Sequence, residues 1–225
     1  MLSSTQGEMK QANKVCWSKK SKDFLKSKLT PELAEFIGIM LGDGYLSYPR
    51  NPRIKISFNS EDDKEYLCFV RELLTKLFST KIKTEHRKNE KTSNLYIFNI
   101  KLLRYLMNDI GLKSSPKWNL AEIPEWIFKK KLEKHVLRGY FDTDGCVVIT
   151  DNNGTRYPRL EMKICPSPMQ KQFISILYNY QFKFGVYDIG KGKVRIQMNG
   201  RKQLKKWMSI VGFHNNKHQI KANSF

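Results

Sequence analysis

The chain has 225 residues, of which 40% are hydrophobic and 12% aromatic, enough for a packed core in one large or two small domains. It has no run of 18 apolar residues and no apolar core of a secretion signal at its start, so neither a membrane span nor secretion is expected. Forty-one Lys and Arg residues oppose 21 Asp and Glu residues, and the net charge of +20 indicates a polyanionic partner. A generally lysine-rich composition is the plainer alternative. An anionic membrane is a weaker one, because no basic amphipathic helix stands out.

The four cysteines, Cys16, Cys68, Cys146 and Cys165, are scattered along the chain. None forms a C-x-x-C pair and no histidine clusters with them, which argues against a zinc site. Scattered thiols are typical of a reducing compartment, so we expect the cytoplasm, the nucleoid or an organellar matrix.

In chain order, residues 1–29 are rich in Lys and Ser and are predicted to form a basic N-terminal arm. A helix is predicted over 31–41, with Thr30 as its N-cap and Pro31 in its first turn. Two strands, a helix capped by Ser60, two more strands and a last helix follow. Their predicted ranges are 45–48, 53–58, 60–78, 81–87, 94–100 and 101–110.

The second half of the chain repeats this order. The stretches LLRYLMNDIGLKSSPK, from Leu102, and QLKKWMSIVGFHNNK, from Gln203, both run from an apolar-periodic helix through a glycine to a lysine. So long a period fits a duplicated domain rather than a solenoid. The predicted second unit has a helix ending at Asp142, strands at 147–150 and 159–164, a helix at 168–180, strands at 184–189 and 193–198, and a helix at 201–211.

The repeated order predicts an α+β fold built from tandem, pseudo-symmetric αββαββα units. We place the two domains at 30–115 and 132–225. The inter-domain connection at 116–131 contains Pro116 and Pro124, which break regular structure.

The two units share a short motif that ends in Asp-Gly. FIGIMLGDGY, from Phe36, and LRGYFDTDGC, from Leu137, each place an apolar run before the pair, and Asp43 and Asp144 lie 101 positions apart. One such ending is most often an ordinary helix stop. Two at the repeat offset, in a strongly basic chain, indicate a functional site.

Glycines in these motifs predict close packing of the two helices. Gly38 and Gly42 are four residues apart and share one helix face, and Gly139 leaves a similar bare spot on the other helix. Parallel packing at these spots would bring Asp43 and Asp144 together.

Two carboxylates at the negative ends of helix dipoles repel each other, an arrangement that suits a divalent cation. Mg²⁺ is typically held by one or two carboxylates together with phosphate oxygens of the substrate, so a pair of carboxylates can serve two scissile phosphates. Gly44 and Gly145, which follow the carboxylates, are expected at the C′ position with positive φ.

FIGIMLGDG and LRGYFDTDG resemble the paired motifs of the LAGLIDADG homing endonucleases, in the single-chain form with two motifs. The resemblance covers about residues 31–218. It implies two antiparallel sheets forming a DNA-binding saddle, two motif helices at the domain interface, and a monomer. The catalytic acid of the family, the second acidic position of the motif, corresponds to Asp43 and Asp144. The first acidic position is Asp142 in one unit but Leu41 in the other, so we expect Asp142 to be structural.

The resemblance also marks a lysine after the third helix of each unit, Lys117 and Lys217. A cation there would polarise the attacking water or stabilise transition-state charge. Asn59, after the second strand, is a weaker candidate for positioning a water. The expected cofactor is Mg²⁺, with Mn²⁺ or Ca²⁺ able to substitute for binding. Its expected ligands are side chains or backbone at the motif ends: Asp43, Asp144, Gly42 (backbone) and Thr143 (backbone).

Recognition of double-stranded DNA is expected from the strands, because a β-ribbon fits the major groove and Arg and Gln can contact bases in a bidentate manner. Two eight-residue strands end to end span roughly 52 Å, or about 15 base pairs. The first-unit candidates are Arg50, Arg53, Lys55, Ser57, Lys83, Glu85, Arg87 and Asn94. The second-unit candidates are Thr150, Asn152, Arg156, Arg159, Glu161, Lys163, Lys191, Lys193, Arg195 and Gln197. A plain solvent-facing surface is the alternative, since half-buried strands normally present one.

The implied function is site-specific, metal-assisted cleavage of both strands of a long asymmetric DNA target, by resemblance across the minor groove and with short 3′ overhangs. An RNA maturase or a non-cleaving DNA-binding regulator on the same scaffold is the alternative. The intact acidic pair favours the nuclease, and the lack of an added helix-turn-helix segment disfavours the regulator. A fragment of an intein is a third alternative, disfavoured because no splicing sequence is visible.

Overall fold

The computed structural model describes residues 29–87 and 90–225, so the predicted basic arm lies outside the described residues except for its last position. In this part of the chain, no helix is both long and apolar enough to cross a membrane. The thiols of Cys68, Cys146 and Cys165 are free.

The first unit follows the predicted order of elements. They are α1 (Pro31–Leu41), β1 (Gly44–Ser47), β2 (Arg53–Asn59), α2 (Lys64–Phe78), β3 (Lys83–Arg87), β4 (Thr92–Ile97) and α3 (Ile100–Asn108). The start of α1 is as predicted, because the Thr30 hydroxyl accepts a hydrogen bond from the Leu33 N–H at 3.3 Å and Pro31 occupies the first turn. A short helix, α4 (Glu125–Lys129), lies between the units.

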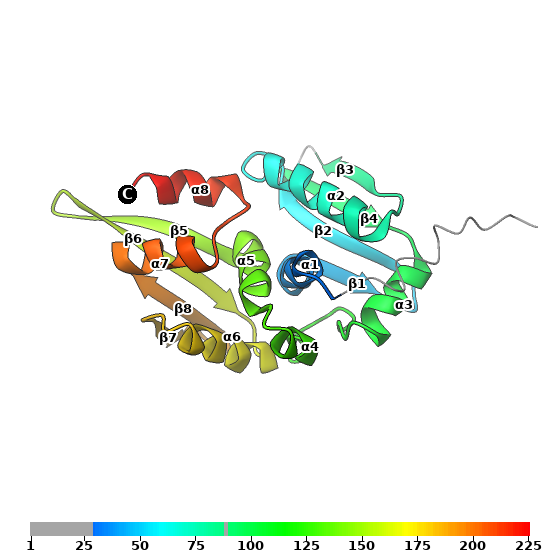
Figure 1. The fold of residues 1–225 in the computed structure, drawn as a ribbon. Helices are drawn as coiled ribbons and strands as arrows, with labels where there is room; N and C mark the ends of the chain where they lie inside the picture. Colours follow the sequence, from blue (N-terminus) through cyan, green and yellow to red (C-terminus); the bar gives the residue numbers. More distant parts are fainter. Residues whose placement is uncertain (1–28, 88–89) are drawn as a thin grey trace, which may run out of the picture.

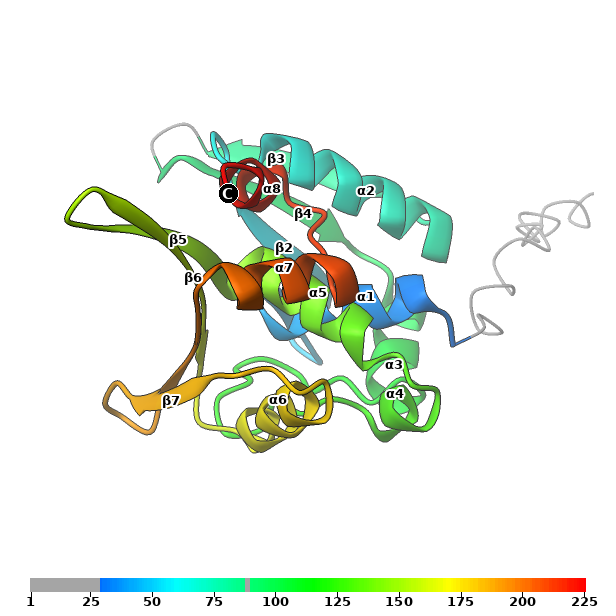
Figure 2. The ribbon, with the colours of Figure 1, turned by 60° about the vertical axis from the view of Figure 1, so that its left-hand side comes forward.

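The second unit repeats the series and adds one helix. Its elements are α5 (Glu133–Asp144), β5 (Gly145–Asn152), β6 (Thr155–Ile164), α6 (Pro168–Asn179), β7 (Gly185–Asp188), β8 (Val194–Asn199), α7 (Arg201–Ile210) and α8 (Asn216–Asn223). The β5–β6 hairpin projects beyond the helices (Figure 1). The added helix α8 packs against β5, and its first residue, Asn216, donates a hydrogen bond to Glu65 at the start of α2 (Figure 2).

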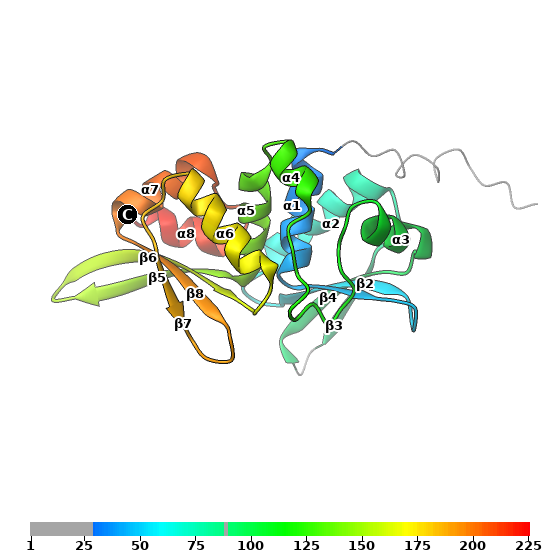
Figure 3. The same cartoon turned by 90° about the horizontal axis from the view of Figure 1, so that it is seen from below.

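Each unit forms a four-stranded antiparallel sheet, and the two strand orders match, β1-β2-β4-β3 and β5-β6-β8-β7. Along β2, Ile54, Ile56 and Phe58 are buried while the alternate side chains remain partly exposed, so one face packs against helices. Both sheets lie on one side of the molecule with the helices on the other (Figure 3). The predicted α+β fold of tandem αββαββα units is confirmed.

Some local predictions were wrong. Ser60 does not cap α2, because a turn follows it and Asp63 occupies the N-cap position. The helix predicted to end at Asp142 continues to Asp144. Helices α4 and α8 were not predicted, because α4 is short and α8 is polar over most of its length.

The prediction of positive φ at Gly44 and Gly145 was also wrong. Neither residue has a positive φ, and that of Gly145 is −93°. Glycine is required there for space instead. A Cβ on Gly145 would lie 2.5 Å from the Phe141 carbonyl oxygen, and one on Gly44 would lie 2.7 Å from the Met40 oxygen. The chain turns back against its own helix at both positions.

The two motif helices, α1 and α5, pack side by side at the centre of the molecule, between the two units (Figures 1 and 3). A Cβ on Gly38 would lie 2.2 Å from the Val136 carbonyl oxygen, and a Cβ on Gly139 would lie 2.2 Å from the Glu35 carbonyl oxygen. No side chain of any size fits between these backbones. The two glycines therefore allow the direct helix contact that the sequence predicted.

Substituting either glycine by alanine tests this contact. We expect Gly38→Ala and Gly139→Ala to lower the free energy of unfolding by about 3 kcal/mol or more, because the new methyl group meets backbone atoms that cannot rotate away. Urea denaturation measures the loss. Gly154→Ala is the control, since Gly154 has φ +79° but open space around it, and backbone strain alone costs about 1–2 kcal/mol. Equal losses in all three variants would contradict the close approach.

Helix α8 packs onto the second unit through a buried histidine. His218 lies beside the rings of Phe141 and Phe213, with centroid distances of 5.3 and 5.7 Å. Burial, and then the nearby charges of Lys217 and Lys221, lower the pKa of His218 to about 3. The imidazole is therefore neutral in the folded protein.

This histidine makes stability depend on pH. The unfolded chain protonates His218 near pH 6.5 and the folded chain only near pH 3, so stability is lost as the pH falls from 6.5 towards 3. We expect His218→Phe, which keeps an aromatic ring, to reduce this loss by a few kcal/mol at about pH 4. Urea unfolding at several pH values gives the difference between variant and wild type. A His218→Phe profile parallel to the wild type would refute the assignment.

Candidate active site

The packing of α1 against α5 brings their acidic ends together. Asp43 joins α1 to β1, and Asp144 is the last residue of α5. The Asp144 Oδ2 atom lies only 3.3 Å from the position of a Cβ on Gly42, and Thr143 lies closer still. Both residues reach the surface, while surrounding protein atoms reduce the hydration of their carboxylates. The junction between the units thus presents two neighbouring carboxylates.

Ionisation of both carboxyl groups at this junction is unfavourable. Loss of hydration, and then the charge of Asp43, raise the pKa of Asp144 to about 7, while Lys117 opposes the shift. Loss of hydration also raises the pKa of Asp43, with a further contribution from Asp63 and opposition from Lys117 and Lys217. A cation between the two carboxylates would relieve this repulsion.

The donor set fits a hard divalent cation. Across residues 29–87 and 90–225, no group of three His, Cys, Asp or Glu side chains is arranged to hold a metal ion. Two carboxylates with the remaining positions filled by water and substrate phosphate oxygens are typical of Mg²⁺, whereas a closed structural site would need more protein ligands.

Lys117 binds the C-terminal end of α1. Its ammonium donates to the carbonyl oxygens of Met40, Leu41 and Gly42 at 2.6, 3.0 and 2.9 Å. Burial lowers the pKa of Lys117 to about 8, and the charges of Asp144 and Asp43 act in the opposite direction. The lysine therefore caps the helix and places a positive charge behind the carboxylate pair.

Lys217 lies on the Asp43 side and makes a different contact. Its ammonium forms an ion pair of 2.7 Å with Asp63 at the start of α2. Asp43 opens onto a cavity of about 350 Å³ that Asn59 and Asp63 also line. The amide oxygen of Asn59 accepts hydrogen bonds from the two backbone N–H groups of residues 61 and 62, so this side chain shapes the turn before α2.

Asp142 is buried and holds the segment after α7. Its Oδ2 accepts a hydrogen bond from the His214 N–H at 2.8 Å, and its backbone carbonyl accepts one from the Asn215 amide at 2.9 Å. Burial raises the pKa of Asp142 to about 8, and the hydrogen bond from the His214 N–H acts in the opposite direction. Asp142, the first acidic position of the motif, is thus bonded to other protein groups.

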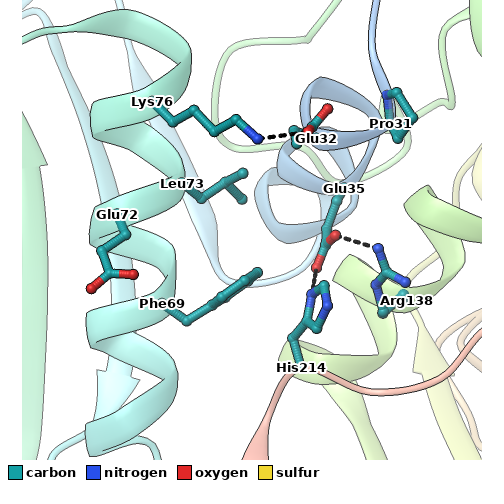
Figure 4. A pocket seen from close by; sticks show the side chains of 9 residues that line it. All are labelled: Pro31, Glu32, Glu35, Phe69, Glu72, Leu73, Lys76, Arg138 and His214. Atoms are coloured by element: carbon teal, nitrogen blue, oxygen red, sulfur yellow. Dashed lines mark hydrogen bonds and ion pairs between the residues drawn. The ribbon is translucent and has the colours of Figure 1, made fainter.

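Ion pairs join the units on the helical side (Figure 4). The buried Glu35 on α1 accepts from Arg138 on α5 at 2.6 Å and contacts His214 at 2.5 Å. Burial raises the pKa of Glu35, but the bonds from His214 and Arg138 outweigh it and the pKa lies below its ordinary value. A cavity of about 430 Å³ opens beside them, lined by Phe69 and Lys76 among others.

The first sheet gathers its predicted DNA-contacting side chains on one face. Residues opposite each other in antiparallel register share a face, and Ser57 and Glu85 both lie opposite Asn94. This face points away from the buried side chains of β2. By register, it carries Arg53, Lys55, Ser57, Lys83, Glu85, Arg87 and Asn94. Asn94 is buried, and its side-chain oxygen accepts a hydrogen bond from Ser57.

The second sheet has an equivalent face. Glu161 lies opposite Gln197, and Lys163 opposite Arg195. The Arg159 guanidinium pairs with Glu161 at 2.6 Å, as Arg87 does with Glu85 at 3.1 Å. By register, this face carries Thr150, Arg159, Glu161, Lys163, Arg195 and Gln197, and the backbone of Asn152 pairs with Thr155 in the same hairpin.

Four predicted contact residues lie elsewhere. Arg156 is one position out of register, on the opposite face, with its guanidinium 5.5 Å above the Phe225 ring, so we leave it out of the interface. Lys191 and Lys193 lie in the β7–β8 turn, where the Lys193 ammonium is 5.1 Å from the Trp118 ring. Arg50 lies in the β1–β2 loop.

Residues 35–205, well over half of the chain, match the family model described as the LAGLIDADG DNA endonuclease family. The chain belongs to this family. Over 122 residues, 54% of its length, the LAGLIDADG chain is also 31% identical to the replication factor C small subunit of Methanocaldococcus jannaschii. The match covers only 6% of that relative.

Solved structures share the fold. The LAGLIDADG meganuclease I-AabMI bound to uncleaved DNA aligns with a TM-score of 0.58 and 10% identity, covering 87% of this chain and 88% of that one. I-DmoI in complex with DNA and Mn aligns with a TM-score of 0.51 and 17% identity, covering 81% of this chain and 96% of that one. The LAGLIDADG fold predicted from the paired motifs is confirmed.

Several residues that surround the LAGLIDADG helices were not predicted from the sequence. Asp63, Asn215 and the Glu35–Arg138 pair come together only in three dimensions. Asp63 alone carried a local signal, since Asp is favoured at helix N-caps. It stands in the run SEDD, where Ser60 was the equally plausible choice.

Removal of the Lys117 ammonium tests its capping of the first LAGLIDADG helix. We expect Lys117→Met to lower the free energy of unfolding by about 1–3 kcal/mol, because the carbonyl groups at the end of α1 lose their donor. Differential scanning calorimetry measures the change. Lys113→Met is the matched control, because Lys113 pairs with Glu122 at the surface, where ion pairs contribute under about 1 kcal/mol. Equal losses in the two variants would contradict a capping role.

Proposed function

We propose that this chain is a homing endonuclease that cuts both strands of a long, asymmetric DNA target with the help of a divalent cation. The observation that carries the proposal is the pairing of Asp43 and Asp144 at the ends of two helices whose backbones touch at Gly38 and Gly139. Membership of the LAGLIDADG DNA endonuclease family supports the same reaction class.

Mg²⁺ is the proposed cofactor, with Mn²⁺ or Ca²⁺ able to replace it for binding. A bound divalent cation supplies a Lewis acid that activates water and neutralises charge on the phosphate. Asp43 and Asp144 hold it through their carboxylates, with backbone at Gly42 and Thr143 nearby. The Gly42 carbonyl accepts from Lys117, and a carbonyl oxygen can accept a second bond.

The two lysines are the proposed cationic partners of the reaction. The ammonium of Lys117 holds the α1 carbonyl groups and lies close enough to both carboxylates to influence their pKa. Lys217 acts on Asp43 from the other side. Positive charge fixed next to a scissile phosphate stabilises the charge that develops there without reorganisation during the step.

The open faces of the two sheets are the proposed DNA-binding surface. They lie on the same side of the molecule and present arginines held by neighbouring glutamates, Arg87 by Glu85 and Arg159 by Glu161. Arg87 is also paired with Glu90 through a terminal nitrogen, whereas Arg159 is held through Nε and keeps its two terminal nitrogens for bidentate contact with guanine in the major groove. The two faces differ in sequence, so the target is asymmetric. We further propose that the chain acts as a monomer, cuts across the minor groove and leaves short 3′ overhangs.

The alternative is a maturase or a regulator that binds nucleic acid without cutting it. The intact carboxylate pair favours cleavage, because two like charges at a junction destabilise a protein that makes no use of them.

Exchange of each carboxylate for an amide tests the proposal. A target is first selected from a randomised duplex library by cleavage with the wild-type chain in Mg²⁺. We expect Asp43→Asn and Asp144→Asn to lower the cleavage rate of at least one strand by about a hundredfold or more, with binding of the duplex in Ca²⁺ changed by less than about threefold. Denaturing gels and filter binding give the two quantities. Asp151→Asn, an exposed carboxylate in β5, is the control. Full double-strand cutting by both site variants would refute the assignment.

A further inference from the structure

The segment that carries each lysine lies against the opposite unit. After α3, the Asn119 N–H donates to the Pro166 carbonyl at 2.7 Å, so the Lys117 segment lies against the β6–α6 connection of the second unit. After α7, the Asn216 amide donates to Glu65 at 2.6 Å, so the Lys217 segment lies against the β2–α2 connection of the first unit. The two lysines therefore occupy pseudo-equivalent positions.

The N-cap residues at the two connections next to these lysine segments are not equivalent. At the first connection the N-cap residue of the following helix is Asp63, whose carboxylate binds Lys217 at 2.7 Å. At the second connection the N-cap residue is Ser167, whose hydroxyl donates to the Cys165 carbonyl at 3.1 Å. Lys117 binds three backbone carbonyl groups at the end of α1 instead. Of the two lysines, only Lys217 is bound by a carboxylate of the connection against which its segment lies.

Asp63 is also tied to the backbone around the site. Its Oδ2 accepts from the Asn59 N–H at 3.1 Å, and its Oδ1 accepts from the Asn215 amide at 2.8 Å. The same Asn215 amide donates to the Asp142 carbonyl, two residues before Asp144. The Asp63 side chain is almost fully enclosed, with 11% of its surface exposed, so its charge is compensated by these fixed partners and by Lys217.

We propose that Asp63 is a positioning residue that makes the two cleavage centres unequal, by holding Lys217 beside Asp43 while the centre at Asp144 relies on Lys117. The inference rests on the proposed function. It predicts that one strand of the target is cut with the help of the Asp63–Lys217 pair and the other strand independently of it. Asp43 and Asp63 line one cavity, so the Lys217 ammonium bound to Asp63 lies on the Asp43 side of the junction, whereas the Lys117 ammonium lies at the end of α1.

The test is a strand-resolved cleavage assay on the selected target, with each strand carrying its own fluorescent label. We expect Asp63→Asn to slow the cutting of one strand by about tenfold or more, while the other strand is cut within about twofold of the wild-type rate. Lys217→Met should slow the same strand. The double variant Asp63→Asn/Lys217→Met should be no slower than the slower single variant, since the two residues act as one unit. Ser167→Ala, at the pseudo-equivalent position, should leave both strands unaffected.

Two results separate the possible failures. Equal slowing of both strands by Asp63→Asn, or slowing of different strands by Asp63→Asn and Lys217→Met, would overturn the positioning role while leaving the endonuclease intact. A wild-type chain that nicks neither strand of any duplex in Mg²⁺ would overturn the proposed function and the inference with it. Lys217 is partly exposed, so its variant reports on the site even where Asp63→Asn lowers stability.

Discussion

The contact between the backbones of α1 and α5 is the constraint on which the molecule depends. Gly38 and Gly139 each remove the one side-chain atom that would separate the helices, since a Cβ at either position would lie 2.2 Å from a carbonyl oxygen across the interface. This contact fixes the two units relative to each other, places their sheets on one side, and brings Asp43 beside Asp144. Repulsion between these carboxylates is the cost of that approach, and a divalent cation is the natural way to remove it.

The pseudo-symmetry of the fold is broken where the chemistry is expected. The two sheets have the same strand order, and each third helix is followed by a lysine that reaches the centre. The surroundings of the lysines differ, with carbonyl groups around Lys117 and a carboxylate against Lys217. Glu35 on α1 likewise binds Arg138 on α5 across the interface. The corresponding positions, on α5 for the acid and on α1 for the base, hold no such pair. A duplicated chain can thus keep one scaffold and adapt each half to a different strand of DNA.

Much of this could be predicted from the sequence, because the relevant patterns are local or periodic. The N-cap and proline at the start of α1, the alternation along β2 and the paired Asp-Gly motifs each follow from a few neighbouring residues. Other features could not be predicted. The polar α8 has no apolar stripe, and its burial depends on one histidine packed among rings of the second unit. Arg156 was placed on the wrong face because periodicity does not define register through a turn. The Asp63–Asn215 contact joins residues far apart in the chain.

The most direct test of the central claim is the position of the metal. A crystal of the chain with its selected duplex, grown with Mn²⁺, gives an anomalous signal that identifies the ion without reference to the protein atoms. We predict manganese density in contact with the carboxylates of both Asp43 and Asp144, next to the phosphates to be cut. Manganese bound elsewhere, or these two carboxylates turned to opposite sides of the molecule, would contradict the role assigned to the packed helices.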